Sequence, residues 1–148
     1  MIKAQTLYIN VDSNSPQAAL VLNTSNMKPL DTIGSLVVGD TARYTVYAVD
    51  SNGSISSISG DPKYKMNVAI GGLGDPVLAR STNFIASASA WTGSINLNTA
   101  SLTSVIGTTD IYPTYFEVEL IVTGSASDSG SIYTILQSKL NLRNQVIN

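Results

Sequence analysis

The feature that most limits the fold of this 148-residue chain is the one-by-one alternation of apolar and polar residues in short stretches. Residues 6–12 place Leu7 and Ile9 on one face, and residues 43–50 repeat the pattern with Tyr44 and Val46. A period of two is typical of β-strands that bury one face. Further β-prone stretches follow at residues 35–40, 65–70, 77–80, 83–91, 93–97, 115–123 and 132–146. The pattern predicts an all-β, antiparallel β-sandwich of about eight strands.

One short helix is expected between two of these strands. Thr99 is a suitable N-cap, Leu102, Val105 and Ile106 have helical spacing, and Gly107 is a suitable C-terminal stop. The helix would have only about two turns, and no βαβ rhythm is present.

Composition favours a single β-rich domain that covers residues 1–148, with residues 1–35 as a possible N-terminal arm packed against it. Ser, Thr and Asn make up 46 of the 148 residues, and these side chains disfavour helix interiors. Only 12% of residues are charged, against about 25% in typical soluble domains. The apolar content of 43% is sufficient for a buried core.

The absence of cysteine and histidine removes many kinds of chemistry from consideration. Without cysteine there is no disulfide, thiolate or redox dithiol, and without histidine the commonest general base and zinc ligand is missing. We therefore expect no enzyme activity, no catalytic residues, no metal and no cofactor. The eight basic residues never form a run, so we expect no nucleic-acid or membrane partner. The first residues lack a signal-peptide pattern, which predicts synthesis in the cytoplasm.

Two patterns could still be read as chemical sites. The spacing of Asp50, Asn52, Ser54 and Asp61 resembles a calcium loop, but the glycine falls at the wrong position and a hairpin turn explains the pattern better. Glu117 and Glu119 share one strand face and lie about 7 Å apart along it. Two carboxylates can hydrolyse a glycosidic bond when they are suitably separated, but neighbouring carboxylates on a strand usually keep an outer face hydrated.

The aromatic residues leave a binding function open. Seven tyrosines and Trp91 could provide a platform on which a sugar ring stacks, and a carbohydrate-binding or adhesin-like domain is therefore the alternative function, with a glycan as a possible ligand. Core positions and subunit contacts are the simpler explanation, since the tyrosines are spread over many strands.

Two strands carry apolar side chains on both faces. Tyr47 and Val49 lie opposite the Tyr44 set, and Ile121, on the strand that begins at Tyr115, lies opposite its buried set. Each sheet of a sandwich has only one inner face, so the second apolar set needs a partner. We expect Tyr47, Val49, Tyr115 and Ile121 to form a subunit interface in a homo-oligomer.

The second half of the chain contains a distinctive series of motifs. Trp91-Thr92-Gly93-Ser94-Ile95-Asn96-Leu97-Asn98-Thr99 leads into the expected short helix, and a Glu-containing strand (residues 115–120) and a final strand (residues 142–147) follow. Val38-Gly39-Asp40 before residues 44–50 extends the series to residues 36–148. This series resembles bacteriophage tail-fibre and upper-baseplate proteins, in which a similar strand runs into a short helix.

This resemblance implies the N-terminal β-sandwich of a virion structural protein. Such a domain would act in the virion as an attachment or connector module of a tail fibre or baseplate. It would bind other virion proteins and copies of itself, often as a trimer, and the family offers no catalytic residues to transfer.

Overall fold

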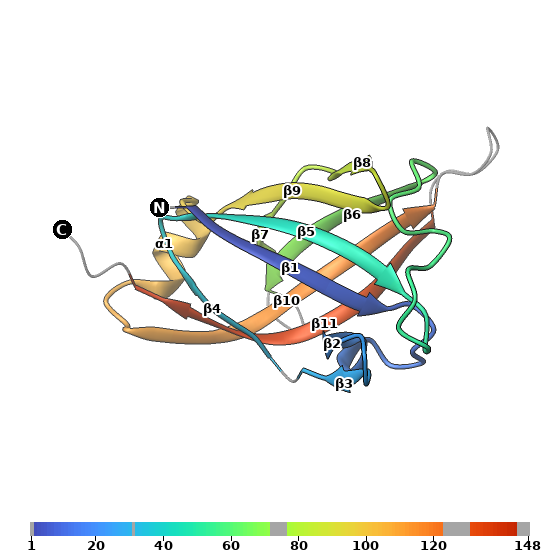
Figure 1. The fold of residues 1–148 in the computed structure, drawn as a ribbon. Helices are drawn as coiled ribbons and strands as arrows, with labels where there is room; N and C mark the ends of the chain where they lie inside the picture. The colour runs from blue at the N-terminus through green and yellow to red at the C-terminus, as the bar shows by residue number, and fades with distance from the viewer. Residues whose placement is uncertain (1, 31, 72–76, 123–130, 145–148) are drawn as a thin grey trace.

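The computed structural model describes residues 2–30, 32–71, 77–122 and 131–144, and these form two twisted sheets packed face to face (Figure 1). The predicted all-β sandwich with one short helix is therefore confirmed. The Gly-rich connection at 72–76, the turn at 124–130 and the final residues 145–148 lie outside the described part of the chain.

Sheet A has six strands in the order β3-β2-β1-β5-β9-β8. Its long central strands are β1 (Ile2–Asn10), β5 (Thr41–Val49) and β9 (Ala90–Asn96), and its short outer strands are β2 (Leu20–Asn23), β3 (Lys28–Pro29) and β8 (Ile85–Ser87). A single turn of 3₁₀ helix, η1 (Pro16–Ala18), links β1 to β2.

Sheet B has five strands in the order β4-β11-β10-β6-β7. Its strands are β4 (Thr32–Val37), β6 (Tyr64–Gly71), β7 (Val77–Arg80), β10 (Ile111–Val122) and β11 (Ser131–Arg143). A register shift between Val118 and Glu119 marks a bulge where β10 pairs with β11.

Two strand pairs are parallel, although hairpin turns led us to expect antiparallel pairing throughout. β1 runs parallel to β5 along its full length, and β4 runs parallel to β11. The chain changes sheet between β4 and β5, and β5 starts at the same end of the sandwich as β1. Gly39, with a φ of +104°, lies in this crossing, where glycine has no steric penalty.

The described residues before position 36 contribute strands to both sheets. β1 lies in the middle of sheet A, between β2 and β5, and β4 forms an edge of sheet B. These residues therefore supply strands of the sandwich, whereas the sequence had allowed for a separate N-terminal arm at residues 1–35.

The core lies between the sheets and is formed by the predicted alternating residues. The Tyr44 ring on sheet A packs against Phe116 on sheet B with ring centroids 5.2 Å apart. Trp91 is fully buried, and its indole N–H donates to the Tyr64 carbonyl oxygen at 2.9 Å. This hydrogen bond joins β9 of one sheet to β6 of the other and satisfies the polar atom of the largest core side chain.

The helix α1 (Ala100–Ile106) forms where the capping pattern predicts it. The Thr99 hydroxyl accepts a hydrogen bond from the Leu102 N–H at 3.2 Å, and Gly107 ends the helix with a φ of +50°. Leu102 and Ile106 are buried, so the helix closes one end of the sandwich (Figure 1).

The stretch 83–91, which alternation predicted as one strand, is divided in the structure. Ser81 and Phe84 donate backbone hydrogen bonds to the edge of β6, in sheet B, and the chain then crosses to sheet A. There β8 and β9 form a hairpin whose two turn residues, Ala88 and Ser89, have φ values of +49° and +66°.

Candidate functional site

The outer face of sheet A carries a row of small hydroxyl side chains. The strand register places Thr6 beside Thr45, Thr45 beside Thr92, and Thr92 beside Ile85. The row thus crosses four strands, β1, β5, β9 and β8, and ends on Ile85, which is 71% exposed. Such a row of short and β-branched side chains gives the sheet a flat outer surface.

This face is almost uncharged. Among residues in outward register on β1, β5, β9 and β8, Arg43 is the one charged residue, and it is exposed. We name this surface the sheet A face, and its outward residues are Ala4, Thr6, Tyr8, Thr41, Arg43, Thr45, Tyr47, Ile85, Ser87, Thr92, Ser94 and Asn96. A shallow depression of about 160 Å³ lies on it between Ala4, Thr6, Arg43 and Thr45.

The opposite outer surface, on sheet B, carries most of the strand charges. The charged residues in outward register on its strands are Lys65, Arg80, Glu117, Glu119, Lys139 and Arg143. Open faces of soluble β-sheets normally carry polar and charged side chains, which sheet B fulfils. The two faces of this sandwich therefore differ strongly in charge.

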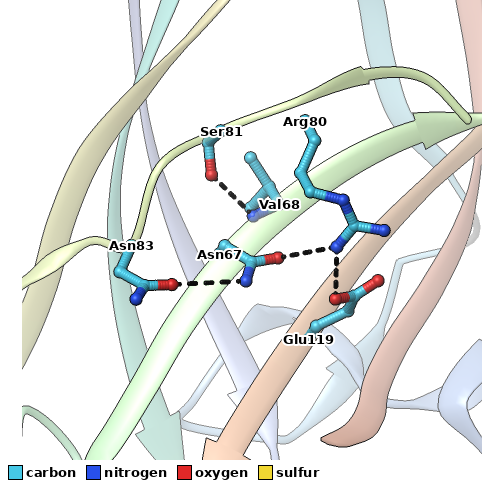
Figure 2. A network of polar contacts seen from close by, with 6 residues as sticks. All are labelled: Asn67, Val68, Arg80, Ser81, Asn83 and Glu119. Carbon is cyan, nitrogen blue, oxygen red and sulfur yellow. Dashed lines mark hydrogen bonds and ion pairs between the residues drawn. The ribbon is translucent and has the colours of Figure 1, made fainter.

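A polar network ties three strands of sheet B together (Figure 2). The Arg80 guanidinium on β7 donates to the Glu119 carboxylate on β10 at 2.6 Å, and it reaches Asn67 on the intervening β6 at 3.5 Å. Asn67 in turn donates to the Asn83 side-chain oxygen at 3.4 Å. Because Glu119 is only 7% exposed, this ion pair satisfies a carboxylate that has lost most of its water.

The second carboxylate of the same strand has a separate partner. Gln137 on β11 donates to the Glu117 carboxylate at 2.7 Å, and Gln17 of η1 donates to Gln137 at 2.8 Å. Glu117 and Glu119 are thus both used as acceptors in cross-strand contacts. This arrangement favours a structural role for the two carboxylates over the hypothesis that they hydrolyse a glycoside.

The four predicted interface residues do not come together. Tyr47 lies half-buried on the sheet A face, where its ring stacks on Tyr8 with centroids 5.6 Å apart and an interplanar angle of 18°. Tyr115 and Ile121 lie half-buried on the outer surface of sheet B, on the other side of the sandwich. One contact surface therefore cannot contain all of them.

The prediction for Val49 is wrong, because its side chain is 0% exposed. The chain after β5 folds back so that Ile55 forms a β-bridge with Val49, and the Val11 N–H donates to the Val49 carbonyl at 3.0 Å. The second apolar face at this position is covered by the protein itself.

Strands β1, β5 and β10 finish at one end of the sandwich, on the right side of Figure 1. A hollow of about 320 Å³ opens at this end. We name this region the loop end; it comprises the connections 11–15 and 50–63 with the neighbouring parts of β10 and β11. Apolar side chains of Val11, Ile58, Leu120 and Ile135 line the hollow, together with Pro16 and the polar residues Asn10, Ser13, Asn14 and Thr134.

The predicted calcium-like segment is part of the loop end and forms a capped turn. One carboxylate oxygen of Asp50 accepts hydrogen bonds from the N–H groups of Asn52 and Ser54, at 2.9 and 3.0 Å. The Asp61 carboxylate instead accepts from the Lys63 N–H at 2.9 Å. In the described residues no three acidic, histidine or cysteine side chains converge as a metal site would require.

No helix in the described part of the chain has the length and apolar character needed to cross a membrane. The comparison with protein-family models gave no match, and neither did the comparison with curated proteins. Among solved structures, the chain is similar to the cysteine protease inhibitor EhICP2 from Entamoeba histolytica, with a TM-score of 0.40 and 7% identity over 97% of each chain. A likeness at this level identifies no function.

The sheet A face was missed by sequence reasoning, which looked for apolar side chains outside the core. A usable signal was nevertheless present, because residues 85–96 contain no charged residue and residues 41–49 contain only Arg43. Knowing that these two segments pair side by side requires the register, which the sequence does not display.

Proposed function

We propose that this chain is a non-catalytic structural module of a bacteriophage virion, of the tail-fibre or baseplate type, and that it assembles through the sheet A face. The observation that carries the proposal is the difference in charge between the two outer faces. Charged side chains usually prevent the solvated face of a sheet from associating with another protein. The sheet A face has one charged side chain, Arg43.

The local contacts on the sheet A face also suit an interface. Tyr8 and Tyr47 stabilise each other before any partner binds, so little side-chain entropy remains to be lost there. Interfaces favour aromatic residues and are depleted of Lys, Asp and Glu at their centres. Thr6, Thr45 and Thr92 offer short side chains over which a second surface can pack closely.

The virion part of the proposal is supported by the resemblance in residues 36–148. The most distinctive motif of this resemblance, residues 91–99, forms β9 and the N-cap of α1. Trp91 is buried there, and Thr99 caps the helix. A compact β-sandwich with few charges and no cysteine is suited to a durable particle component.

Assembly is tested by light scattering at micromolar concentration with matched variants on the two faces. Thr92→Lys adds a charge to the centre of the sheet A face, and Asn141→Lys adds the same charge to exposed sheet B. We expect the wild type and Asn141→Lys to form oligomers, and Thr92→Lys to shift toward the 15.6 kDa monomer. A monomeric wild type would contradict the proposal.

The virion role is tested separately. Antibodies raised against the purified chain should label the tail or baseplate of particles released from a lysing source culture, as seen by electron microscopy. Labelling of cell debris with no labelled particles would overturn the assignment to a virion.

Carbohydrate binding is a second candidate, and one arrangement on sheet B favours it. Half-buried Tyr115 shares the outer surface with Glu117, Gln137 and Lys139, so an aromatic ring lies beside planar polar groups. A glycan array would test this candidate, with Tyr115→Ala as the control that should abolish any signal. On sheet A, by contrast, Tyr8 and Tyr47 stack on each other.

A further inference from the structure

We propose that the partner of the sheet A face is the loop end of a second copy of this chain. This inference rests on the proposed function and adds to it the orientation of the subunits. The contact is head-to-face, so each copy uses two different surfaces, and it is built from one shape match and one charge match.

The shape match joins Ile85 to the hollow at the loop end. Ile85 is the most exposed large apolar side chain of the described residues, at 71%, and it projects from the sheet A face. The hollow of about 320 Å³ is roughly ten times the ~30 Å³ that one water occupies in the liquid, so it can accept a branched aliphatic side chain. Its apolar walls, which include Ile58 and Leu120, provide the matching chemistry.

The charge match joins Arg43 to the carboxylates beside the hollow. Residues 11–15 and 50–63 contain Asp12, Asp50 and Asp61 but only one basic residue, Lys63. Asp12 stands between the lining residues Val11 and Ser13, and it is linked to the Asp50 turn because its carboxylate accepts from the Ser51 N–H at 3.2 Å. Arg43 forms no ion pair with a described residue, so its guanidinium remains available for a partner's carboxylate.

On each of the two surfaces, the apolar and the charged group belong to one region. On the sheet A face, Arg43 and Ile85 are two strands and two residues apart, which is about 12 Å for strands spaced ~4.8 Å with a rise of ~3.3 Å per residue. At the loop end, Asp12 lies between the lining residues Val11 and Ser13, and its carboxylate accepts from the N–H of Ser51, the residue after Asp50.

A symmetric face-to-face dimer fits the charges less well. It would bring Arg43 of each copy against a face on which no outward residue of β1, β5, β8 or β9 is acidic. A head-to-face contact repeats from copy to copy, and it closes into a ring such as a trimer or continues as a filament, depending on the rotation at each step.

The decisive experiment mixes two variants that each lose a different half of the contact. The face variant, Arg43→Glu with Ile85→Asp, keeps a normal loop end. The end variant, Asn14→Lys with Thr134→Lys, alters exposed residues at the rim of the hollow and leaves the Asp50 turn intact. Asn98→Lys with Ser101→Lys adds the same charges at the opposite end of the sandwich and is the control.

We expect each contact variant alone to be monomeric, with at least a tenfold higher dissociation constant than the wild type. An equimolar mixture should form one-to-one dimers of twice the 15.6 kDa chain mass that grow no further. The control should assemble like the wild type. If the end variant assembles normally while the face variant does not, the contact is face-to-face and this inference is wrong, whereas the proposed function stands.

Cysteine cross-linking gives an independent readout, because the chain contains no cysteine of its own. Under mild oxidation, a mixture of Ile85→Cys and Ser13→Cys chains should give a cross-linked heterodimer more efficiently than either variant alone. Equal cross-linking of the Ile85→Cys chain with itself would overturn the head-to-face arrangement. A monomeric wild type would overturn both this inference and the proposed function.

Discussion

The ring of Phe84 occupies the space that a side chain at Gly93 would need. A Cβ atom built on Gly93 would lie 2.2 Å from Cδ1 of the Phe84 ring and 2.6 Å from its Cγ. Phe84 is 7% exposed and comes from the segment that crosses from sheet B to sheet A. The contact therefore fixes where the chain between β7 and β8 enters the core.

We predict that Gly93→Ala lowers the free energy of unfolding by about 1–3 kcal/mol, which is typical of overpacking in a core. The strand itself would tolerate alanine, so the loss should come from displacement of the Phe84 ring. Urea unfolding measures the change. Phe84→Leu replaces the ring with a smaller side chain, so in that background Gly93→Ala should lower the free energy of unfolding by clearly less. Equal costs in both backgrounds would contradict the explanation.

The turn of the β8–β9 hairpin supplies a second prediction. Ala88 and Ser89 both have positive φ, which costs roughly 1 kcal/mol for a residue with a Cβ atom. The double substitution Ala88→Asn with Ser89→Gly introduces the residues that such a turn prefers, and it should raise the free energy of unfolding by about 1 kcal/mol. The matched control Ala86→Gly, in the extended part of the same hairpin, should lower it by ~0.5–1 kcal/mol. Thermal melts followed by circular dichroism distinguish the two.

The same hairpin illustrates how far the sequence predicts the fold. Alternation identified the long strands and their buried faces correctly, since Leu7, Val46 and Phe116 are all buried. It extended a single strand through Ala88 because neither glycine nor asparagine marks a turn there. The turn is held from outside: the Ser59 hydroxyl donates to the Ser89 carbonyl at 2.6 Å, and a Cβ on Gly60 would lie 2.4 Å from the Ala90 nitrogen. A contact thirty residues away cannot be recognised from local pattern.

The candidate site was predictable only in part. Because residues 43–50 carry apolar side chains on both faces, we expected Tyr47 and Val49 to point outward. Tyr47 lies on the outer face of sheet A, but Val49 is buried. Val49 differs from Tyr47 because of a tertiary contact: the residues after β5 fold back, and Ile55 pairs with Val49. The row of Thr6, Thr45 and Thr92 depends on two strand registers that join distant segments, one of them parallel.

Burial of Tyr44 leads to a prediction about alkaline stability. Tyr44 is 2% exposed, and burial raises its pKa above the usual 10.0. Above pH 10 the unfolded chain therefore loses the Tyr44 proton while the folded chain keeps it, so stability falls as pH rises. From pH 9 to pH 11, Tyr44→Phe should lose about 1.4 kcal/mol less stability than the wild type, measured by urea unfolding at each pH.

The control for this prediction is a second buried hydroxyl. Both the Tyr44 and Thr114 hydroxyls lack a hydrogen-bond partner within the described residues, so Tyr44→Phe and Thr114→Val should each be close to neutral at pH 7. Only Tyr44 titrates in the alkaline range. A pH dependence for Thr114→Val that matches that of Tyr44→Phe would show that the effect does not come from ionisation.

The Arg80–Glu119 ion pair provides the last prediction, which concerns the edge of sheet B. β7 has only four residues, and the Arg80 side chain reaches over β6 to Glu119 on β10, at 2.6 Å. Arg80→Met keeps the aliphatic stem but leaves a carboxylate with 9% side-chain exposure without its cation. Because the Arg80 side chain is 46% exposed and partly screened by water, we expect a loss of about 1 kcal/mol or less at pH 7. Lys65→Met, an exposed residue on the neighbouring strand, should have a smaller effect. A double-mutant cycle with Glu119→Gln isolates the pair, and a coupling energy of zero would mean that β7 is held by its backbone hydrogen bonds and Leu78 alone.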